Sequence, residues 1–145
     1  KSGPAIVEML KSAGYDVKET LLLADEQKLL EKEMIRLSDQ RQINLIFTTG
    51  GTGFSKRDRT PEATNAVCDR MANGIAEAIR NYSMTITPRA MFSRAVSGIR
   101  NNTVIINLPG SPKAVKESLE FLLPNLEHGL GILTNRENEC GAPSL

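Results

Sequence analysis

Aromatic residues are scarce in this sequence, and no excess of charge of either sign accompanies their scarcity. Phe and Tyr make up 4% of the 145 residues, Trp is missing, and 18 Lys and Arg stand against 17 Asp and Glu. Surfaces for single-stranded nucleic acid rely on aromatic side chains that stack with bases. Duplex or anionic-membrane binding needs a basic surface. The composition therefore predicts neither a nucleic-acid nor a membrane partner.

Cysteine, histidine and long apolar runs are also rare. Cys68 lies in a helical apolar pattern and is expected to be a small buried hydrophobe, whereas Cys140 lies in a polar Gly/Pro tail. The pair permits a disulfide, but no secretion signal accompanies it, which favours a reduced cytoplasmic setting. Apolar runs such as 43–47 are far shorter than the ~20 residues that span a bilayer. The only histidine, His128, shows no zinc or catalytic-triad spacing and is expected at the surface.

What the chain does contain is an alternation of extended and helical patterns, within a length that fits one domain. Predicted strands lie within 15–24, at 43–47, and in a hairpin whose arms, 96–100 and 103–107, flank Asn101–Asn102. Predicted helices cover 4–10, 26–39, a segment from Thr60 that Asn73–Gly74 breaks, 75–81, and a long segment from Ser111–Pro112 that Pro124 bends or ends. This order predicts a three-layer α/β/α sandwich with a mainly parallel sheet and one β-hairpin. Ligands of such sheets bind beyond the carboxyl ends of the strands.

A glycine-rich turn, Thr48–Gly53, follows the predicted strand at 43–47. Its three glycines permit positive φ and a close approach to a ligand. Successive backbone N–H groups can then converge on an anion, and the hydroxyls of Thr48, Thr49 and Thr52 add donors. The spacing is neither that of a Walker A loop nor that of a dinucleotide fingerprint. Taken alone, the turn fits a phosphate site and a ligand-free tight turn about equally.

Charged residues follow this turn directly. Lys56, Arg57 and Arg59 surround Asp58, just before the helix start Thr60–Pro61–Glu62, where Thr60 would supply the capping hydroxyl. A carboxylate beside a phosphate site is suited to hold Mg²⁺. The alternative is an acid that only pairs with its arginine neighbours.

Three further loops follow strands or precede helices. The amides of the loop Asn107–Pro112 and Ser111 point to where an anion would bind at a positive helix end, but taken alone the loop fits a plain helix cap better. Asp25 is a candidate for a ligand contact or a helix N-cap. Ser93–Arg94 offers a hydroxyl and a guanidinium that could recognise a polar heterocycle or a phosphate.

Taken in order, these motifs resemble a known family. The glycine turn with Arg57–Asp58 and 60–64, then Ser93–Arg94, the hairpin and the loop 107–112, are similar to the molybdopterin-binding adenylyltransferases. These are the MogA/MoaB-type proteins of molybdenum cofactor biosynthesis, related to the G domain of gephyrin. The likeness covers essentially the whole chain. Family members begin with a strand before the segment matching Ser2–Gly3–Pro4, so residues 1–145 are expected to form a single molybdopterin-binding domain that lacks this first strand.

The resemblance implies a reaction and a site. The terminal phosphate of molybdopterin would attack the α-phosphorus of ATP, with Mg²⁺, and pyrophosphate would leave. Asp25 and Asp58 would be catalytic, with Asp58 the metal ligand. Ligand contacts would come from two sets: Thr49, Gly50, Gly51, Thr52 and Gly53 on the nucleotide side, and Ser93, Pro109, Gly110 and Ser111 on the pterin side.

The resemblance also implies a homotrimer, or a dimer of trimers, and hand-over of the product to a molybdate-inserting protein. Two other functions are open at this point. One is a pterin-binding MoaB-type paralogue with little turnover, against which the presence of both Asp25 and Asp58 argues. The other is a gephyrin-like scaffold domain.

Overall fold

The computed structural model describes residues 2–134. Five α-helices lie in this range: α1 (Ser2–Ser12), α2 (Gln27–Ile35), α3 (Thr60–Val67), α4 (Asn73–Met84) and α5 (Pro112–Leu133). A π-helical turn, η1 (Arg36–Gln40), continues α2, and a 3₁₀ turn, η2 (Pro88–Phe92), follows α4. Four strands complete the described part: β1 (Leu45–Thr49), β2 (Arg70–Met71), β3 (Ser97–Arg100) and β4 (Thr103–Leu108).

The sheet has the order β1-β4-β3-β2. β1 pairs in parallel with β4, and β3 runs antiparallel to both β4 and β2. Three of the four strands therefore share one direction, and only β3, the first arm of the hairpin, is reversed. Asn101 takes a left-handed conformation (φ 52°) in the turn of that hairpin. The predicted mainly parallel sheet with one hairpin is confirmed.

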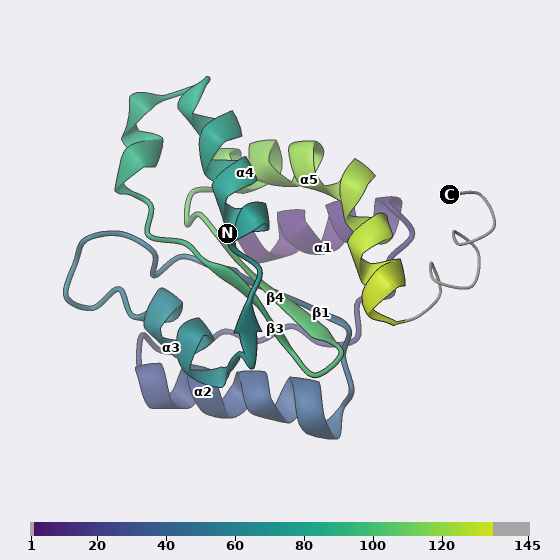
Figure 1. Cartoon of the computed structure of the whole chain (residues 1–145). Coiled ribbons are helices and arrows are strands. Elements are labelled where there is room, and N and C mark those ends of the chain that lie inside the picture. Colours follow the sequence, from purple (N-terminus) through teal and green to yellow (C-terminus); the bar gives the residue numbers. More distant parts are fainter. Residues whose placement is uncertain (1, 135–145) are drawn as a thin grey trace.

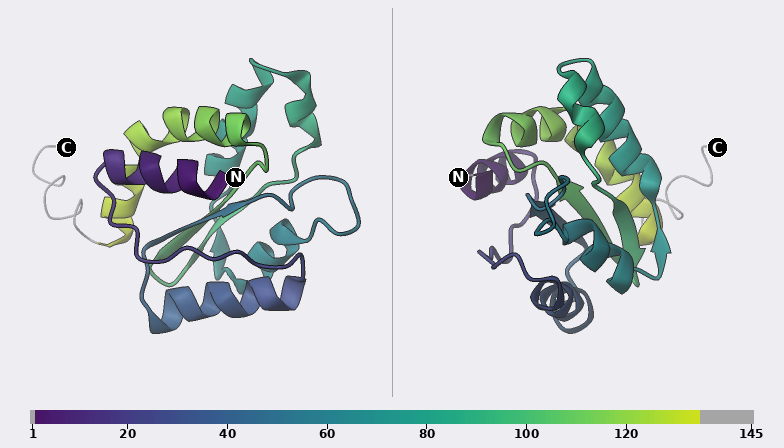
Figure 2. Two further views of the ribbon diagram at one scale, coloured as in Figure 1. Left: turned by 180° about the vertical axis from the view of Figure 1, so that it is seen from behind. Right: turned by 90° about the vertical axis from the view of Figure 1, so that its left-hand side faces the viewer.

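Helices cover both faces of the sheet, as Figures 1 and 2 show. On one face α1, α4 and α5 pack over Val104, Ile106 and Leu108 of β4. On the other face α2 and α3 pack over Ile105 and over Ile46 of β1. All six residues of β4 are buried, because this strand lies inside the sheet and beneath both helix layers. The three-layer prediction is confirmed, and the core is divided by the sheet into two apolar clusters.

The strand expected within 15–24 is not formed. Figure 2 shows the segment between α1 and α2 as a plain tube that crosses from one helix layer to the other. Leu22, part of the apolar run that suggested a strand, is fully exposed at 101%. A strand needs a neighbour to satisfy its backbone groups, and a groove of about 930 Å³ lies between this segment and β1.

Other element boundaries also differ from the sequence predictions. α3 ends at Val67 instead of near Asn73, because the chain turns into β2, where Asp69 N–H and Ala72 N–H donate to carbonyls of β3. Asn73–Gly74 begins α4 and does not break a helix. Thr60 is the first residue of α3 and makes no capping hydrogen bond.

Of the two alternatives left open for Pro124, the last helix follows the bend. α5 continues through Pro124 to Leu133, and Figure 1 shows that it changes direction near its middle, as a proline inside a helix requires. Cys68, expected to be buried, is only half-buried at the end of α3, and burial raises the pKa of its thiol to about 11. His128 is exposed. Cys140 lies outside the described residues.

Candidate functional site

The glycine turn lies directly after β1, at the carboxyl end of the parallel strand pair. Gly50 and Gly51 have φ of +83° and +70°, where L side chains are strained. A Cβ on Gly51 would lie 2.2 Å from Thr60 Oγ1, and one on Gly53 would lie 2.9 Å from Asp58 Oδ2. Gly51 therefore requires glycine, because its φ is left-handed and the start of α3 approaches its backbone closely, whereas a side chain at position 53 would meet only the end of the Asp58 side chain.

The same conformation leaves backbone donors available. Gly50 N–H donates to Leu108 O at 3.2 Å, but within the described part of the chain no acceptor lies in hydrogen-bond reach of the N–H groups of Gly51, Thr52 and Gly53. Three successive donors after residues with left-handed φ can form an anion-binding concavity. Thr52 as a whole is buried, 7% exposed, and it lies between Gly51 and Gly53, which are partly exposed.

The loop after β4 lies against the glycine turn. The parallel register pairs Thr49 with Leu108, so both chains leave the sheet side by side. Thr49 Oγ1 donates to Pro109 O at 2.9 Å, and a Cβ on Gly110 would lie 3.4 Å from Gly50 Cα. The Ser111 hydroxyl accepts from Ala114 N–H, so it caps α5, which is the alternative that the sequence left open.

Of the two candidate carboxylates, only Asp25 lines the groove beside β1. Asp25 is exposed and lines the groove together with Thr48, Thr49, Gly50 and Thr60. Asp58 does not line that groove and contacts Gly53 instead. Its Oδ2 accepts from Ser55 N–H at 3.0 Å, and no hydrogen bond from the described residues reaches its Oδ1. One oxygen of Asp58 is therefore available to a cation.

Asn107 is a site residue to which the sequence reasoning, which placed it at the end of a hairpin arm and the start of a loop, gave no role of its own. It is 1% exposed, and its Nδ2 donates to Thr48 Oγ1 at 3.0 Å and to Thr64 Oγ1 at 2.9 Å. Its Oδ1 accepts from Val96 N–H at 3.1 Å. One amide thus links β1, α3 and the entry to β3 behind the glycine turn. The available signal was a polar residue at the end of the apolar run 104–106.

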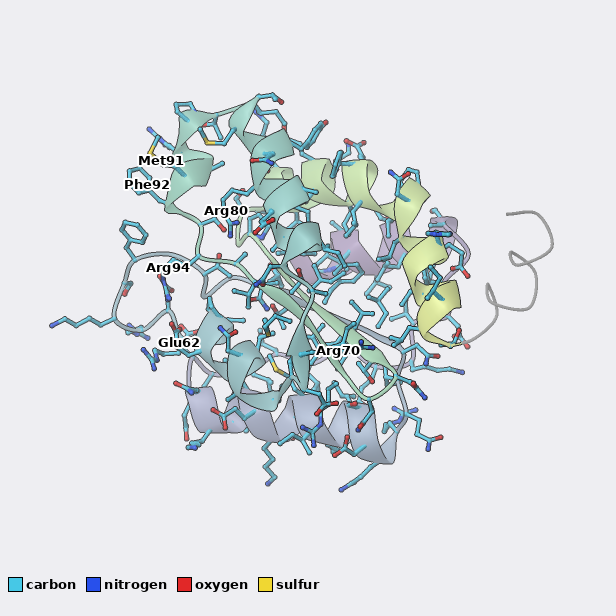
Figure 3. All side chains as sticks on the ribbon, viewed as in Figure 1. Glu62, Arg70, Arg80, Met91, Phe92 and Arg94 are labelled. Carbon is cyan, nitrogen blue, oxygen red and sulfur yellow. The ribbon has the colours of Figure 1, made fainter. Side chains whose placement is uncertain are left out.

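Arg94 has a different role from the one its motif suggested. Figure 3 shows it between α3 and η2, close to Glu62. Its Nη1 donates to Glu62 Oε2 at 2.6 Å and its Nη2 to Glu62 Oε1 at 3.4 Å, while Nε and Nη2 also donate to the backbone carbonyls of Gly53 and Asp58. This ion pair lowers the pKa of Glu62 and raises that of Arg94. The neighbouring Ser93 hydroxyl accepts from Ala95 N–H, and its carbonyl accepts from Arg80 Nε.

Three exposed apolar side chains lie beside the glycine turn. Phe54 is 69% exposed, and its ring meets that of Phe92 edge-on at a centroid distance of 5.3 Å. Phe92 and Met91, neighbours in η2, are 51% and 54% exposed and project from the same side of the molecule in Figure 3. We call Phe54, Met91 and Phe92 the loop patch.

The described residues limit two other kinds of site. None of the helices in residues 2–134 combines the length and apolar character that a bilayer crossing needs. In the same range no three acidic, cysteine or histidine side chains gather closely enough to hold a metal ion by themselves.

Fold and site together define a three-layer α/β protein with free backbone donors in a glycine loop at the carboxyl end of parallel strands, as in proteins that bind phosphate-bearing ligands. A family model described as a probable molybdopterin binding domain matches residues 1–128. The chain belongs to this molybdopterin-binding domain family.

Similar proteins carry matching names. The molybdopterin adenylyltransferase of Helicobacter pylori is 42% identical over 134 residues, which is 91% of this chain and 76% of that protein. The molybdopterin adenylyltransferase of Escherichia coli K12 is 45% identical over 123 residues, 83% of this chain and 63% of that protein. The crystal structure of the molybdopterin biosynthesis enzyme MoaB from Thermus thermophilus has a TM-score of 0.87 and 43% identity, and the likeness covers 92% of this chain and 84% of that one.

Proposed function

We propose that this protein adenylylates molybdopterin with ATP and Mg²⁺ in molybdenum cofactor biosynthesis. The observation that carries the proposal is the set of free N–H groups at Gly51, Thr52 and Gly53, held by the loop after β4 in a chain of the molybdopterin-binding family. Relatives that are 42% and 45% identical are named for this activity, which supports it.

The reaction joins two phosphate-bearing substrates, so positioning and neutralisation of charge are its main needs. The terminal phosphate oxygen of molybdopterin forms a bond to the α-phosphorus of ATP as the bond to pyrophosphate breaks. The N–H groups of Gly51, Thr52 and Gly53 in the glycine turn would hold phosphate oxygens. Ser93, Pro109, Gly110 and Ser111 would contact the pterin side, and Asp25 would act from the groove that it shares with Thr49 and Gly50.

Asp58 suits a magnesium ion. Mg²⁺ in nucleotide enzymes is held by one or two carboxylates together with substrate phosphates and water. A single carboxylate with one free oxygen beside a row of N–H donors matches that ligand set. When bound, the ion would neutralise negative charge on the phosphates of ATP.

The experiment that tests the proposal is direct. The protein is incubated with molybdopterin, ATP and Mg²⁺, and adenylylated molybdopterin and pyrophosphate are measured. We expect both products in equal amounts. Tight molybdopterin binding without product would instead identify a pterin-binding paralogue, and neither binding nor product would favour a scaffold role.

A further strand beside β1 also stays a proposal. Among the described residues β1 pairs only with β4, so its other edge is open. The groove at that edge is lined by apolar side chains of β1, α1 and the segment 15–23. A strand from a segment ahead of Ser2 would lie in the part of the groove along Leu45–Phe47 and satisfy the free edge, which leaves the end at Asp25 and Thr49 open.

The oligomeric state and the cellular location of the protein are part of the same proposal. We propose a homotrimer, and the exposed loop patch supports an interface because contiguous exposed apolar groups usually mark contact surfaces. The cytoplasmic setting and the hand-over of product to a molybdate-inserting protein stay predictions.

A further inference from the structure

Arg94 joins both ends of the loop that carries Asp58. Its Nε donates to Gly53 O at 2.8 Å, and its Nη2 donates to Asp58 O at 2.6 Å. Its backbone N–H donates to Thr52 O at 2.7 Å. One residue thus holds the first and last carbonyls of the segment 53–58, whose four middle residues, 54–57, are all exposed.

Glu62 fixes the guanidinium from the opposite side. Both of its carboxylate oxygens accept from Arg94, at 2.6 Å and 3.4 Å, and the two side chains are about one-third exposed. Because Glu62 lies in the first turn of α3, the ion pair ties the loop 53–58 to a helix that packs on the sheet. Figure 3 shows the pair at the junction of α3 with the segment after η2.

We propose that Arg94 is a positioning residue of the adenylylation reaction. By closing the loop 53–58, it holds the Asp58 carboxylate and the Gly51–Gly53 donors in the arrangement that binds Mg²⁺ and the phosphates of a nucleoside triphosphate. This inference rests on the proposed function. Arg94 acts through the loop and does not touch the reacting atoms.

The chemistry requires arginine at this position. A planar guanidinium presents its donors in a fixed fork, so it binds two carbonyls and a carboxylate at once, whereas a lysine ammonium is a single point of charge. Displacement of a catalytic group by about 1 Å is enough to lower a rate about 100-fold. Arg94→Lys should therefore release the loop although the charge is kept.

Arg100 provides a matched control. It binds both oxygens of Asp39, at 3.0 Å and 2.7 Å, and donates to the carbonyl of Val67 at 2.7 Å, so its contacts are of the same kind. It lies in β3 and makes no contact with the loop 53–58. Arg100→Lys removes an equivalent network without changing that loop.

The experiment compares wild type, Arg94→Lys, Arg100→Lys and Glu62→Gln in two measurements. Amide hydrogen exchange of residues 53–58 reports closure of the loop, and Mg²⁺-dependent turnover and ATP binding report its consequence. For Arg94→Lys we expect faster exchange, a Mg²⁺ requirement raised by about tenfold and a kcat lowered roughly 10- to 100-fold, with the KM for molybdopterin within about twofold of wild type. Arg100→Lys should match wild type in loop exchange, Mg²⁺ requirement, kcat and KM. Glu62→Gln, which keeps the contacts of Arg94 with the carbonyls, should give values between those of wild type and Arg94→Lys.

Two results would overturn the inference. One is unchanged exchange of residues 53–58 in Arg94→Lys, and the other is an equal loss of turnover in Arg94→Lys and Arg100→Lys. Failure of the proposed function is a separate result. If the wild type binds ATP and Mg²⁺ without turnover, calorimetric ATP affinity takes the place of kcat. If it binds no nucleotide, loop exchange alone decides whether Arg94 closes the loop.

Discussion

At the scale of single residues, the nearest neighbours of a glycine decide whether its position tolerates a side chain. Gly51 must be glycine because of its φ and because of Thr60 Oγ1, whereas Gly129 in α5 has no atom within 4 Å of a built Cβ. The same residue type is therefore required in one place and replaceable in the other.

Gly51→Ala should damage both stability and binding. Left-handed φ costs an alanine about 1–2 kcal/mol, and the contact with Thr60 must also be relieved, so we expect the free energy of unfolding to fall by about 2 kcal/mol or more. ATP affinity should fall at least about tenfold, which corresponds to 1.4 kcal/mol. Denaturant unfolding and calorimetry measure the two effects.

Gly129→Ala is the control for that substitution, because alanine in an open helical position should stabilise the protein by up to about 1 kcal/mol. Equal behaviour of the two variants would contradict the role given to Gly51.

Asp58→Asn tests the metal ligand at the same scale. The amide keeps the shape and can still accept from Ser55 N–H, but it removes the negative charge that would hold Mg²⁺. We expect kcat to fall by roughly 100-fold or more, with molybdopterin affinity largely retained. Normal turnover in this variant would remove Asp58 from the mechanism.

At the level of elements, the segment between α1 and α2 is held by charge and not by strand pairing. Glu19 accepts from Arg36 and, at 2.6 Å, from Arg41, which connects the segment to η1 and the residue after it. These arginines lower the pKa of Glu19 to about 2, from an ordinary value of 4.5. Leu22 is fully exposed and adds no packing of its own.

Glu19→Gln should therefore have a pH-dependent effect. Because the folded pKa is depressed, the stabilisation by Glu19 is complete above about pH 4.5 and is lost as the pH falls toward about 2. We expect a lower midpoint of thermal unfolding than wild type at pH 7, with the difference shrinking through that window. Asp16→Asn, which removes an exposed pair with Lys18, should change stability by less than about 0.5 kcal/mol. A difference that does not depend on pH would contradict the assignment.

For the whole molecule, the loop patch is the feature that points beyond one chain. If it lies in a trimer interface, light scattering should give about three times the 15.9 kDa of one chain. Phe92→Glu should lower that mass, because a charge is costly to bury. Ile132→Glu, which changes a similarly exposed apolar residue of α5, should keep it. A wild-type monomer would contradict the trimer.

The sequence by itself determined the layers and predicted the loops of the candidate site. Helical periodicity and the apolar runs at 43–47 and 103–107 are local patterns, and the glycine turn needs positive φ wherever it occurs. Those patterns predicted the sandwich, the hairpin and the loops at 48–53 and 107–112. Local patterns failed where strand pairing decides the result. Leu21–Leu23 resembled a strand but pairs with no strand of the described residues, whereas Arg70–Met71 became a strand because β3 lies beside it.

Only the tertiary structure decided how the loops meet. The parallel register of β1 with β4 brings Gly50 against Gly110, and residues far apart in the chain define the contacts behind them. Asn107 reaches Thr64, and Arg94 reaches Gly53, Asp58 and Glu62. Sequence patterns report on residues within a few positions of each other, whereas these hydrogen bonds span more than thirty. The sequence therefore determined which loop could hold a phosphate, and the fold decided which side chains hold that loop in place.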